Sequence, residues 1–260
     1  MLIKDAAAVI TGSSSGIGAA TARLFAEQGC HVMINYSHNR DGAEAVAKDC
    51  RALGVKAEIF QANVAEDEQC RAMVAAALEA FGRLDVLVNN AGTTRFCPHQ
   101  NLDGLQKQDF LDIYSVNLVG AFQMTRAAEP ALRKAGKAHV INTASIAGLA
   151  GVGSSIAYAA SKGALLTMTK SLARVLGPEI RVNAVCPGFV QGEWLKEGLG
   201  EEGYEAELAR RKARSALNDA ASPETVAQVI LGMIIGGDLV TGEAILVDGG
   251  AHLTQSGVRR

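Results

Sequence analysis

Short runs of apolar, β-branched residues alternate along the chain with longer stretches in which apolar residues recur at helical spacing. The short runs predict seven strands, at residues 7–10, 32–36, 57–61, 86–88, 138–142, 181–185 and 244–247. Each run is almost continuously apolar, which is typical of strands buried on both faces of a parallel sheet. The longer stretches predict helices at residues 17–28, 41–53, 66–81, 110–134, 158–176 and 223–235.

This alternation predicts an α/β fold, a Rossmann-type doubly wound parallel sheet of about seven strands with helices on both faces. No linker, charge block or internal repeat interrupts the pattern, so residues 1–260 are expected to form a single domain. The polar segment 189–218 follows the sixth strand and holds the only tryptophan, Trp194. It is expected to form a lid over the functional site.

Composition excludes several classes of partner. The formal net charge of −2, with both signs mixed along the 260 residues, offers no basic surface to nucleic acid or to an anionic membrane. The five cysteines include no Cys-x-x-Cys pair, and no His, Cys, Asp and Glu cluster has ligand spacing, so neither disulfides nor a metal site is expected. The apolar run before Gly12 is too short for a membrane span or a signal peptide. A cytoplasmic location is therefore expected.

A glycine-rich turn follows the first predicted strand directly and leads into a helix. Residues 11–18 read Thr-Gly-Ser-Ser-Ser-Gly-Ile-Gly. Such a turn lets the backbone approach a pyrophosphate, and the N–H groups at the start of the helix attract its negative charge. On this feature alone, an ordinary turn before a helix is the more frequent interpretation, and the surrounding motifs favour the phosphate site.

The end of the second predicted strand bears on the choice of nicotinamide cofactor. An acidic residue there would hold the adenosine ribose of NAD and repel a 2′-phosphate. The chain instead has Asn35, Tyr36 and Ser37, followed by Arg40, and Asn35, Ser37 and Arg40 could donate hydrogen bonds to a phosphate. NADP(H) is therefore favoured and NAD(H) stays possible. Arg40 could equally be a solvated residue of the next helix.

Three residues form a candidate acid/base set after the fifth predicted strand. Tyr158 and Lys162 are four residues apart on one helix face, and Ser145 lies upstream. A phenol can protonate a carbonyl oxygen as hydride reaches the carbon, although its ordinary pKa of ~10 makes it a weak base near neutrality. Lys162 is expected to lower the pKa of Tyr158 and to hold the nicotinamide ribose, while Ser145 would polarise the substrate oxygen.

These motifs, in this order, resemble those of the classical short-chain dehydrogenase/reductase family over essentially the whole chain. The resemblance includes the glycine turn, the Asn-Asn-Ala-Gly sequence at residues 89–92, Ser145 with Tyr158 and Lys162, and Pro187-Gly188. Within the family, the region of Asn35 and the chain end near residues 241–250 are similar to 3-oxoacyl-carrier-protein reductases and to sugar or polyol dehydrogenases.

The resemblance implies a fuller set of site residues. It adds Asn117 to the catalytic set, as the anchor of a proton-relay water beside Lys162. The cofactor residues expected from the motifs together are Gly12, Ser14, Ser15, Gly16, Ile17, Gly18, Tyr36, Ser37, Arg40, Asn63, Val64, Asn90, Ala91, Gly92, Tyr158, Lys162, Pro187, Gly188 and Val190.

Two positions depart from the family pattern. Asn63 stands where the family usually has aspartate near the adenine, and an amide can still make those hydrogen bonds. Gly192 stands where a threonine or serine usually holds the carboxamide and the diphosphate, and Gln191 is a possible substitute.

The predicted substrate is a small carbonyl or alcohol compound, such as a 3-oxoacyl thioester, a ketone or a sugar. Ser145, Tyr158, Arg95 and Trp194 are the expected substrate contacts, with Phe96 and Leu195 beside them. The resemblance also implies a homotetramer or homodimer that forms through helices 110–134 and 158–176. The Ala, Leu and Met faces of these helices could equally be buried within one subunit.

The sequence therefore predicts an NAD(P)-dependent oxidoreductase that transfers hydride between a nicotinamide and a carbonyl or alcohol. The alternative is a non-catalytic NAD(P)-sensing regulatory protein on the same fold, against which the intact acid/base set argues. A serine hydrolase is excluded because Ser145 is not in a Gly-x-Ser-x-Gly elbow and no histidine is placed to act as its base.

Overall fold

A seven-stranded parallel sheet forms the centre of the computed structural model, which describes residues 3–253 without the side chains of residues 193, 194 and 197. The strand order is β3-β2-β1-β4-β5-β6-β7. The strands are β1 (Ala7–Ile10), β2 (His31–Tyr36), β3 (Ala57–Gln61), β4 (Val86–Asn89), β5 (Ala138–Thr143), β6 (Ile180–Pro187) and β7 (Ala244–Val247). The order reverses direction at β1 and β4, which is the arrangement predicted for a doubly wound sheet.

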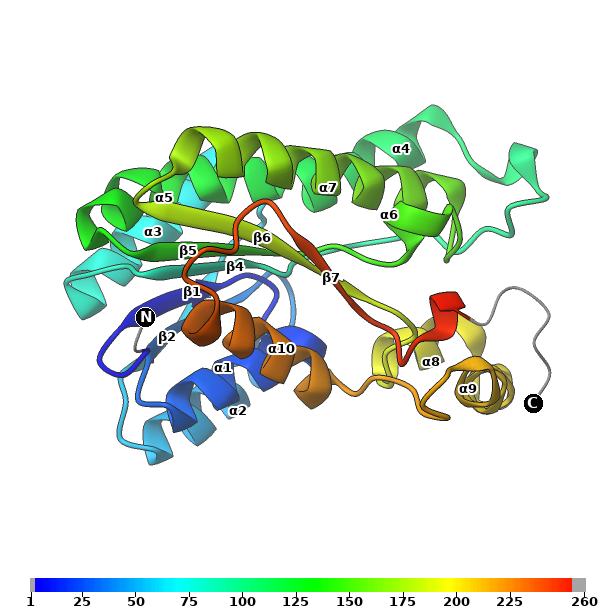
Figure 1. The fold of residues 1–260 in the computed structure, drawn as a ribbon, viewed down its shortest axis with the longest axis horizontal. Coiled ribbons are helices and arrows are strands. Elements are labelled where there is room, and N and C mark those ends of the chain that lie inside the picture. Colours follow the sequence, from blue (N-terminus) through cyan, green and yellow to red (C-terminus); the bar gives the residue numbers. More distant parts are fainter. Residues whose placement is uncertain (1–2, 254–260) are drawn as a thin grey trace.

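Helices cover both faces of the sheet (Figure 1). One face packs against α1 (Gly16–Glu27), α2 (Arg40–Ala52) and α10 (Pro223–Gly236), and the other against α3 (Asp67–Phe81), α5 (Ala121–Ala135) and α7 (Ile156–Leu176). Side-chain direction alternates along each strand, so Val9 packs with the α3 and α5 layer while Ile10 packs with the α1 and α10 layer. Both layers are therefore hydrophobic cores, as the apolar strand runs predict.

Two predictions about the elements are wrong in detail. The edge strands β3 and β7 are only partly buried, because no strand within residues 3–253 pairs with their outer sides. The helix expected at residues 110–134 is divided into α4 (Lys107–Tyr114), the π-helical turn η2 (Ser115–Gly120) and α5. A π turn carries one extra residue per turn, and apolar periodicity does not reveal it.

The carboxyl ends of all the strands meet at one edge of the sheet, and the remaining elements lie at or near that edge. They are α6 (Ala147–Ala150), α8 (Glu193–Leu199), α9 (Glu201–Arg214), and the short 3-10 turns η1 (Leu102–Gly104) and η3 (Ala251–Leu253). Both α8 and α9 lie in segment 189–218, which was expected to form a lid, and most of that segment is therefore helical. This edge is where ligands bind in open α/β sheets.

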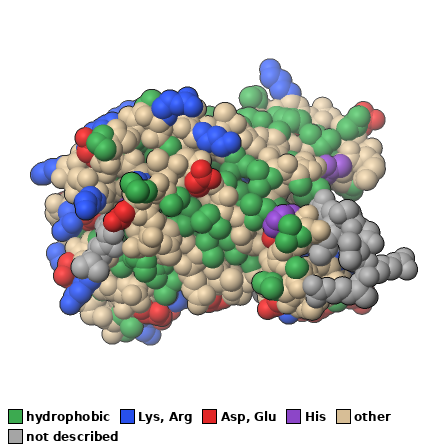
Figure 2. Space-filling model, viewed as in Figure 1, with side chains coloured by type: hydrophobic (Ala, Val, Ile, Leu, Met, Phe, Trp, Pro, Cys, Tyr) green, Lys and Arg blue, Asp and Glu red, His purple; other side chains and the backbone are tan. Residues whose placement is uncertain are grey.

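The outer surface of β7 and α10 is apolar in Figure 2. Ile235, Ile245 and Leu246 are each between one third and one half exposed there. Within residues 3–253, no helix is both long enough and apolar enough to cross a bilayer.

Candidate active site

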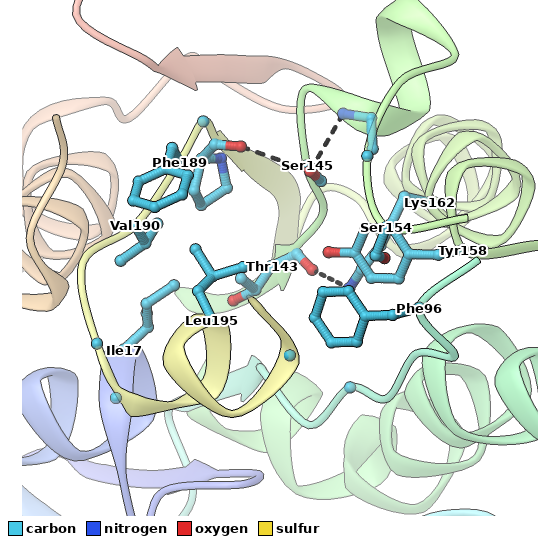
Figure 3. Close-up of a pocket in the computed structure, with 18 of the residues that line it drawn as sticks. Ile17, Phe96, Thr143, Ser145, Ser154, Tyr158, Lys162, Phe189, Val190 and Leu195 are labelled. Carbon is cyan, nitrogen blue, oxygen red and sulfur yellow. Dashed lines mark hydrogen bonds between the residues drawn. The ribbon is translucent and has the colours of Figure 1, made fainter. Parts of the chain in front are cut away.

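A cleft of about 1350 Å³ runs along the carboxyl edge of the sheet, from the glycine turn to the loop after β4 (Figure 3). Small-molecule pockets are usually about 300–1,000 Å³, so this cleft is large enough for more than one ligand part. Most of the residues expected to bind cofactor or substrate line it: Gly12, Ser14, Ser15, Gly16, Ile17, Tyr36, Ser37, Asn90, Ala91, Gly92, Phe96, Ser145, Tyr158, Lys162, Pro187, Gly188, Val190 and Leu195.

Several expected site residues do not line the cleft. Asn63 is exposed and closes a turn onto the Ala65 amide, while Val64 is buried against Gly120. Arg40 is exposed beside Glu44. Gly18 and Asn117 lie behind the wall of the cleft, Arg95 pairs with Asp109, and the side chain of Trp194 is outside the described part of the chain.

The glycine turn is held against β4 by close backbone contacts. Gly12 has φ +60°, and a Cβ there would lie 2.9 Å from Ala91 Cα. A Cβ at Gly18 would lie 2.5 Å from the Gly12 carbonyl oxygen, so the turn can fold onto α1 only if residue 18 has no side chain. Gly18 therefore shapes the turn from behind the cleft wall.

Side chains of neighbouring strands fix the same turn. Asn90 Nδ2 donates to the Thr11 and Gly12 carbonyls at 3.0 and 3.1 Å. Asn35 Oδ1 accepts from Gly12 N–H at 2.9 Å, and its Nδ2 donates to backbone carbonyls, including that of Ala62 at 3.0 Å. The expectation that Asn35 donates to a phosphate is wrong, because these contacts in the buried interior use its amide fully.

The start of α1 fits the diphosphate of a dinucleotide. Its N-cap residue, Ser15, makes no side-chain capping hydrogen bond, so the first N–H groups of the helix remain available at the cleft. The place where a Cβ of Gly16 would stand is open space. An uncapped helix N-terminus at a glycine turn is an established form of phosphate site.

Tyr158, Lys162 and Ser145 meet at the middle of the cleft. Ser155 caps α7 by accepting from Tyr158 N–H at 3.2 Å, so this helix starts two residues earlier than predicted and places Tyr158 in its first turn. The Tyr158 and Ser145 side chains both line this part of the cleft. Ser145 Oγ accepts from Ala147 N–H at 3.1 Å, and Lys162 Nζ donates to the Thr143 carbonyl at 2.7 Å (Figure 3).

The pKa of Tyr158 differs from its expected direction. Burial raises the pKa of Tyr158 to about 12, and the nearby Ser145 hydroxyl offsets only part of that rise. Lys162 does not produce the predicted lowering, because its Nζ lies over the ring, 5.7 Å from the centroid, and donates to Thr143. Burial also lowers the pKa of Lys162 to about 8. At neutral pH, Tyr158 is therefore a protonated donor beside a lysine that is charged but close to its pKa.

Asn117 lies in the π-helical turn directly behind this set. Its amide accepts from Thr93 N–H at 2.8 Å and donates to Ser161 Oγ at 3.0 Å. A Cβ at Gly92 would lie 3.4 Å from Asn117 Oδ1 and 3.6 Å from Lys162 Nζ, so both groups border Gly92. π-helical turns are often found at functional sites.

The other end of the cleft is closed by an aromatic contact. Phe96, from the loop after β4, faces Leu195 of α8 (Figure 3). A Cβ at Gly198 would lie 2.1 Å from Phe96 Cζ, so the ring packs directly on the backbone of α8. The apolar side chains of Phe96, Leu195 and Phe189 suit a substrate with an apolar portion.

Further cleft residues escaped the sequence reasoning. They include His38, Asn39, Cys97, Pro98, His99, Gln100, Thr143, Gly151, Ser154, Phe189, Gly198, Glu207, Arg211 and Pro223. Thr143 and Phe189 are close in sequence to Ser145 and to Pro187-Gly188, at the ends of strands, so their positions could have identified them as cleft residues. Glu207 and Arg211 carried none, because the fold of the α8 and α9 segment brings them to the cleft.

Gly192 is built into the backbone as glycine. It has φ +151°, a conformation that a threonine or serine rarely adopts. Its N–H donates to the hydroxyl of Tyr204 on α9 at 3.3 Å, and Tyr204 packs against Phe189 with ring centroids 5.7 Å apart. Gln191 donates to the Ala220 carbonyl at 3.0 Å. Residue 192 therefore supplies no hydroxyl to the cleft. Its backbone forms a turn that Tyr204 of α9 holds through a hydrogen bond.

The fold and the cleft define a class of α/β enzyme that binds a nucleotide beside an acid/base set. Comparison with known proteins narrows this class. A family model described as enoyl-(acyl carrier protein) reductase matches residues 11–252. The 3-oxoacyl-(acyl-carrier-protein) reductase FabG of Thermotoga maritima is 36% identical, with 96% of this chain and 99% of that protein aligned.

Two further proteins are similar over nearly their whole length. One, from Streptomyces violaceoruber, is named provisionally as ketoacyl reductase 2 of the granaticin polyketide synthase and is 40% identical over 95% of this chain and 96% of its own. The other is a crystal structure from Burkholderia xenovorans, assigned provisionally as a short-chain dehydrogenase/reductase. It has 41% identity and a TM-score of 0.89, over 95% of this chain and 98% of its own. The chain belongs to the short-chain dehydrogenase/reductase family, and it is an oxidoreductase acting on CH–OH or C=O groups.

Proposed function

We propose that this enzyme reduces the 3-oxo group of an acyl thioester with NADPH, with Tyr158 as the proton donor. The observation that carries the proposal is the meeting of Tyr158, Ser145 and Lys162 at the middle of a cleft that begins at the glycine turn. The relatives named as ketoacyl and 3-oxoacyl reductases support this substrate class. Nothing in the site favours a sensing protein that lacks catalysis.

Each member of the set has a definite part in this reaction. The reduced nicotinamide, when bound, supplies hydride to the carbonyl carbon. Ser145 donates a hydrogen bond to the substrate oxygen, and Tyr158 gives that oxygen its proton. Lys162 stabilises the phenolate that forms and holds the nicotinamide ribose. Asn117, which borders Gly92 together with Lys162, anchors the water through which the proton is replaced.

The proposal predicts turnover of a particular substrate pair. Purified enzyme should oxidise NADPH when given a 3-oxoacyl thioester, followed as loss of nicotinamide absorbance. The control is the matched 2-enoyl thioester, which differs at the reacting carbons and addresses the enzyme named in the family model's description. Oxidation with the enoyl compound alone would contradict carbonyl reduction, and NADPH binding without turnover of any carbonyl would favour the sensing alternative.

NADPH preference follows from the adenosine end of the cleft. Ser37, His38 and Asn39 line that end and are exposed. Among the described residues of the cleft wall, the one carboxylate is that of Glu207 on α9, so no described acid faces a 2′-phosphate at the end of β2. Neutral donors at this position favour NADPH over NADH.

A charge placed at residue 37 should reverse this preference. In Ser37→Asp, the carboxylate would repel the 2′-phosphate, and the Kd for NADPH should rise by at least roughly tenfold, while that for NADH stays the same or falls. Fluorescence titration with both cofactors measures the two constants. Ser37→Asn is the matched control, since it has the same size without the charge. Equal weakening by both variants would place the 2′-phosphate elsewhere.

Assembly and location follow as further proposals. Ala159 and Leu165 of α7 are buried within the chain itself, so that part of the face expected to pair is not available to a partner. The exposed apolar surface of β7 and α10, together with Phe122 of α5, remains, and we propose that it forms a homotetramer or homodimer. All five cysteines are free and buried, which is consistent with a cytoplasmic enzyme.

A further inference from the structure

One cation of the cleft has no part in the acid/base set. Among the described residues of the cleft wall, the lysine and arginine side chains are those of Lys162 and Arg211. Lys162 is buried and donates to Thr143 in the middle of the cleft. Arg211 comes from α9, and its side chain is 37% exposed, so its guanidinium can reach a ligand in the cleft.

A carboxylate holds Arg211 in place. Arg211 Nε donates to Glu207 Oε1 at 2.6 Å. Arg210 also binds this carboxylate, through Nε at 2.7 Å and Nη2 at 2.6 Å, and it does not line the cleft. Two guanidinium groups on one carboxylate leave a net positive charge. The bond to Arg211 uses Nε, and no described residue is bonded to its two terminal NH₂ groups, which are the fork that matches phosphate oxygens.

The face of α9 that carries Arg211 is turned toward the turn at Gly192. Tyr204, Glu207 and Arg211 are spaced by three and then four residues, which places them on one side of a helix. Tyr204 marks the direction of that side, because its hydroxyl accepts from Gly192 N–H. Glu207, Arg211 and Gly192 all line the same cleft as Ser15 and its helix α1.

The part of the cleft between the start of α1 and Gly192 needs a positively charged group if it is to bind a diphosphate. A diphosphate at the start of α1 carries two negative charges, and the turn at residues 11–18 contains no lysine or arginine. On the opposite side, Gly192 contributes no hydroxyl, and its N–H is already bonded to Tyr204. Lys196 of α8 lies over the Tyr204 ring and does not line the cleft, so among the described residues of the cleft wall Arg211 is the cation that can supply a charge-assisted hydrogen bond from that side.

We propose that Arg211, oriented by Glu207, binds the diphosphate of the nicotinamide dinucleotide from the α9 side, opposite the N-terminus of α1. It does so in place of the hydroxyl that Gly192 lacks. This inference rests on the proposed binding of NADPH. It also makes α9 part of the cofactor site.

The test compares two neighbouring arginines that bind the same carboxylate. NADPH is titrated by fluorescence, without substrate, into wild type, Arg211→Gln and Arg210→Gln. We expect Arg211→Gln to raise the Kd for NADPH by roughly tenfold to a hundredfold, the value of a charge-assisted hydrogen bond, while Arg210→Gln changes it little. Arg211→Lys, which keeps the charge without the fork, should give an intermediate Kd. Thermal midpoints should be alike, since both arginines are partly exposed.

Other outcomes would overturn the inference. An equal Kd in Arg211→Gln and wild type would show that Arg211 does not touch the cofactor. The same conclusion follows if the Kd is unchanged but KM rises for a 3-oxoacyl phosphopantetheine thioester and not for its phosphate-free N-acetylcysteamine analogue, because the anion would then belong to the substrate. A wild type that binds no NADPH would instead refute the proposed function, and this result is distinct from either of the others.

Discussion

Replacing Tyr158 with phenylalanine should reduce kcat for carbonyl reduction by roughly 10²–10⁴-fold, the usual contribution of a positioned general acid. The change removes one oxygen and leaves the ring, so the cleft keeps its shape. Because the pKa of Tyr158 is raised to about 12, the group that is lost is a proton donor at every pH at which the enzyme is assayed. Single-turnover reduction with NADPH in excess measures the chemical step.

Cofactor binding separates this effect from misfolding. The Kd for NADPH should be the same in Tyr158→Phe and wild type, since the phenol oxygen is proposed to act on the substrate. Tyr114→Phe is the matched control, because Tyr114 on α4 lies outside the cleft wall. Near-normal turnover in Tyr158→Phe would remove the phenol from the mechanism.

Replacing Lys162 with methionine should abolish most turnover and yet stabilise the fold. Lys162 is buried, and its pKa falls from 10.5 to about 8 because burial disfavours the ammonium. That fall corresponds to ~3 kcal/mol against the charged form, part of which the loss of the bond to the Thr143 carbonyl would offset. Each kcal/mol gained raises the thermal midpoint of a chain of this size by about 2–4 °C.

The pH dependence of this gain has a definite sign. A base with a folded pKa below its unfolded pKa destabilises the fold most at pH values below the folded pKa. The penalty disappears as pH rises from about 8 through 10.5, so the advantage of Lys162→Met should be greatest at neutral pH and shrink toward pH 10.5. Wild-type reduction should also decline above pH 8 as the ammonium is lost.

Calorimetry of wild type, Lys162→Met and Lys170→Met across this pH range is the measurement. Lys170 is exposed on the same helix, so its replacement by methionine controls for the change of side chain alone. A lower midpoint for Lys162→Met at neutral pH would mean that the bond to Thr143 outweighs the cost of burial.

The sequence was sufficient for the sheet because buried parallel strands leave an unambiguous apolar signal. Val9 and Ile10 face opposite hydrophobic cores, so both residues are apolar, and the strand could be predicted from this pattern. The break between α4 and α5 could not be predicted from the sequence, because Asn117 and its neighbours in the π turn also fit the pattern of a continuous α-helix. The helix ends moved by a residue or two where a cap such as Ser155 set them.

Some residues of the site could likewise be predicted from the sequence, and others could not. Residues in short motifs at strand ends, such as Gly12 and Ser145, came to the cleft because the carboxyl edge of the sheet fixes where strand ends lie. Asn35 was misjudged, since only the three-dimensional contacts show that its amide is already used. Arg211 was missed because its place depends on how α9 folds back over residues 189–192, which no local pattern encodes.

The contact between Phe96 and Gly198 ties two distant sequence positions to each other in evolution. The ring occupies the space that a side chain at residue 198 would need, with only 2.1 Å between Phe96 Cζ and the Cβ position. A relative with alanine at 198 must turn the Phe96 ring away, which opens the closure, or have a smaller residue at 96, and a relative with a small residue at 96 no longer needs glycine at 198. Substrate range should therefore diverge by paired replacements at these two positions, while the acid/base set stays unaltered.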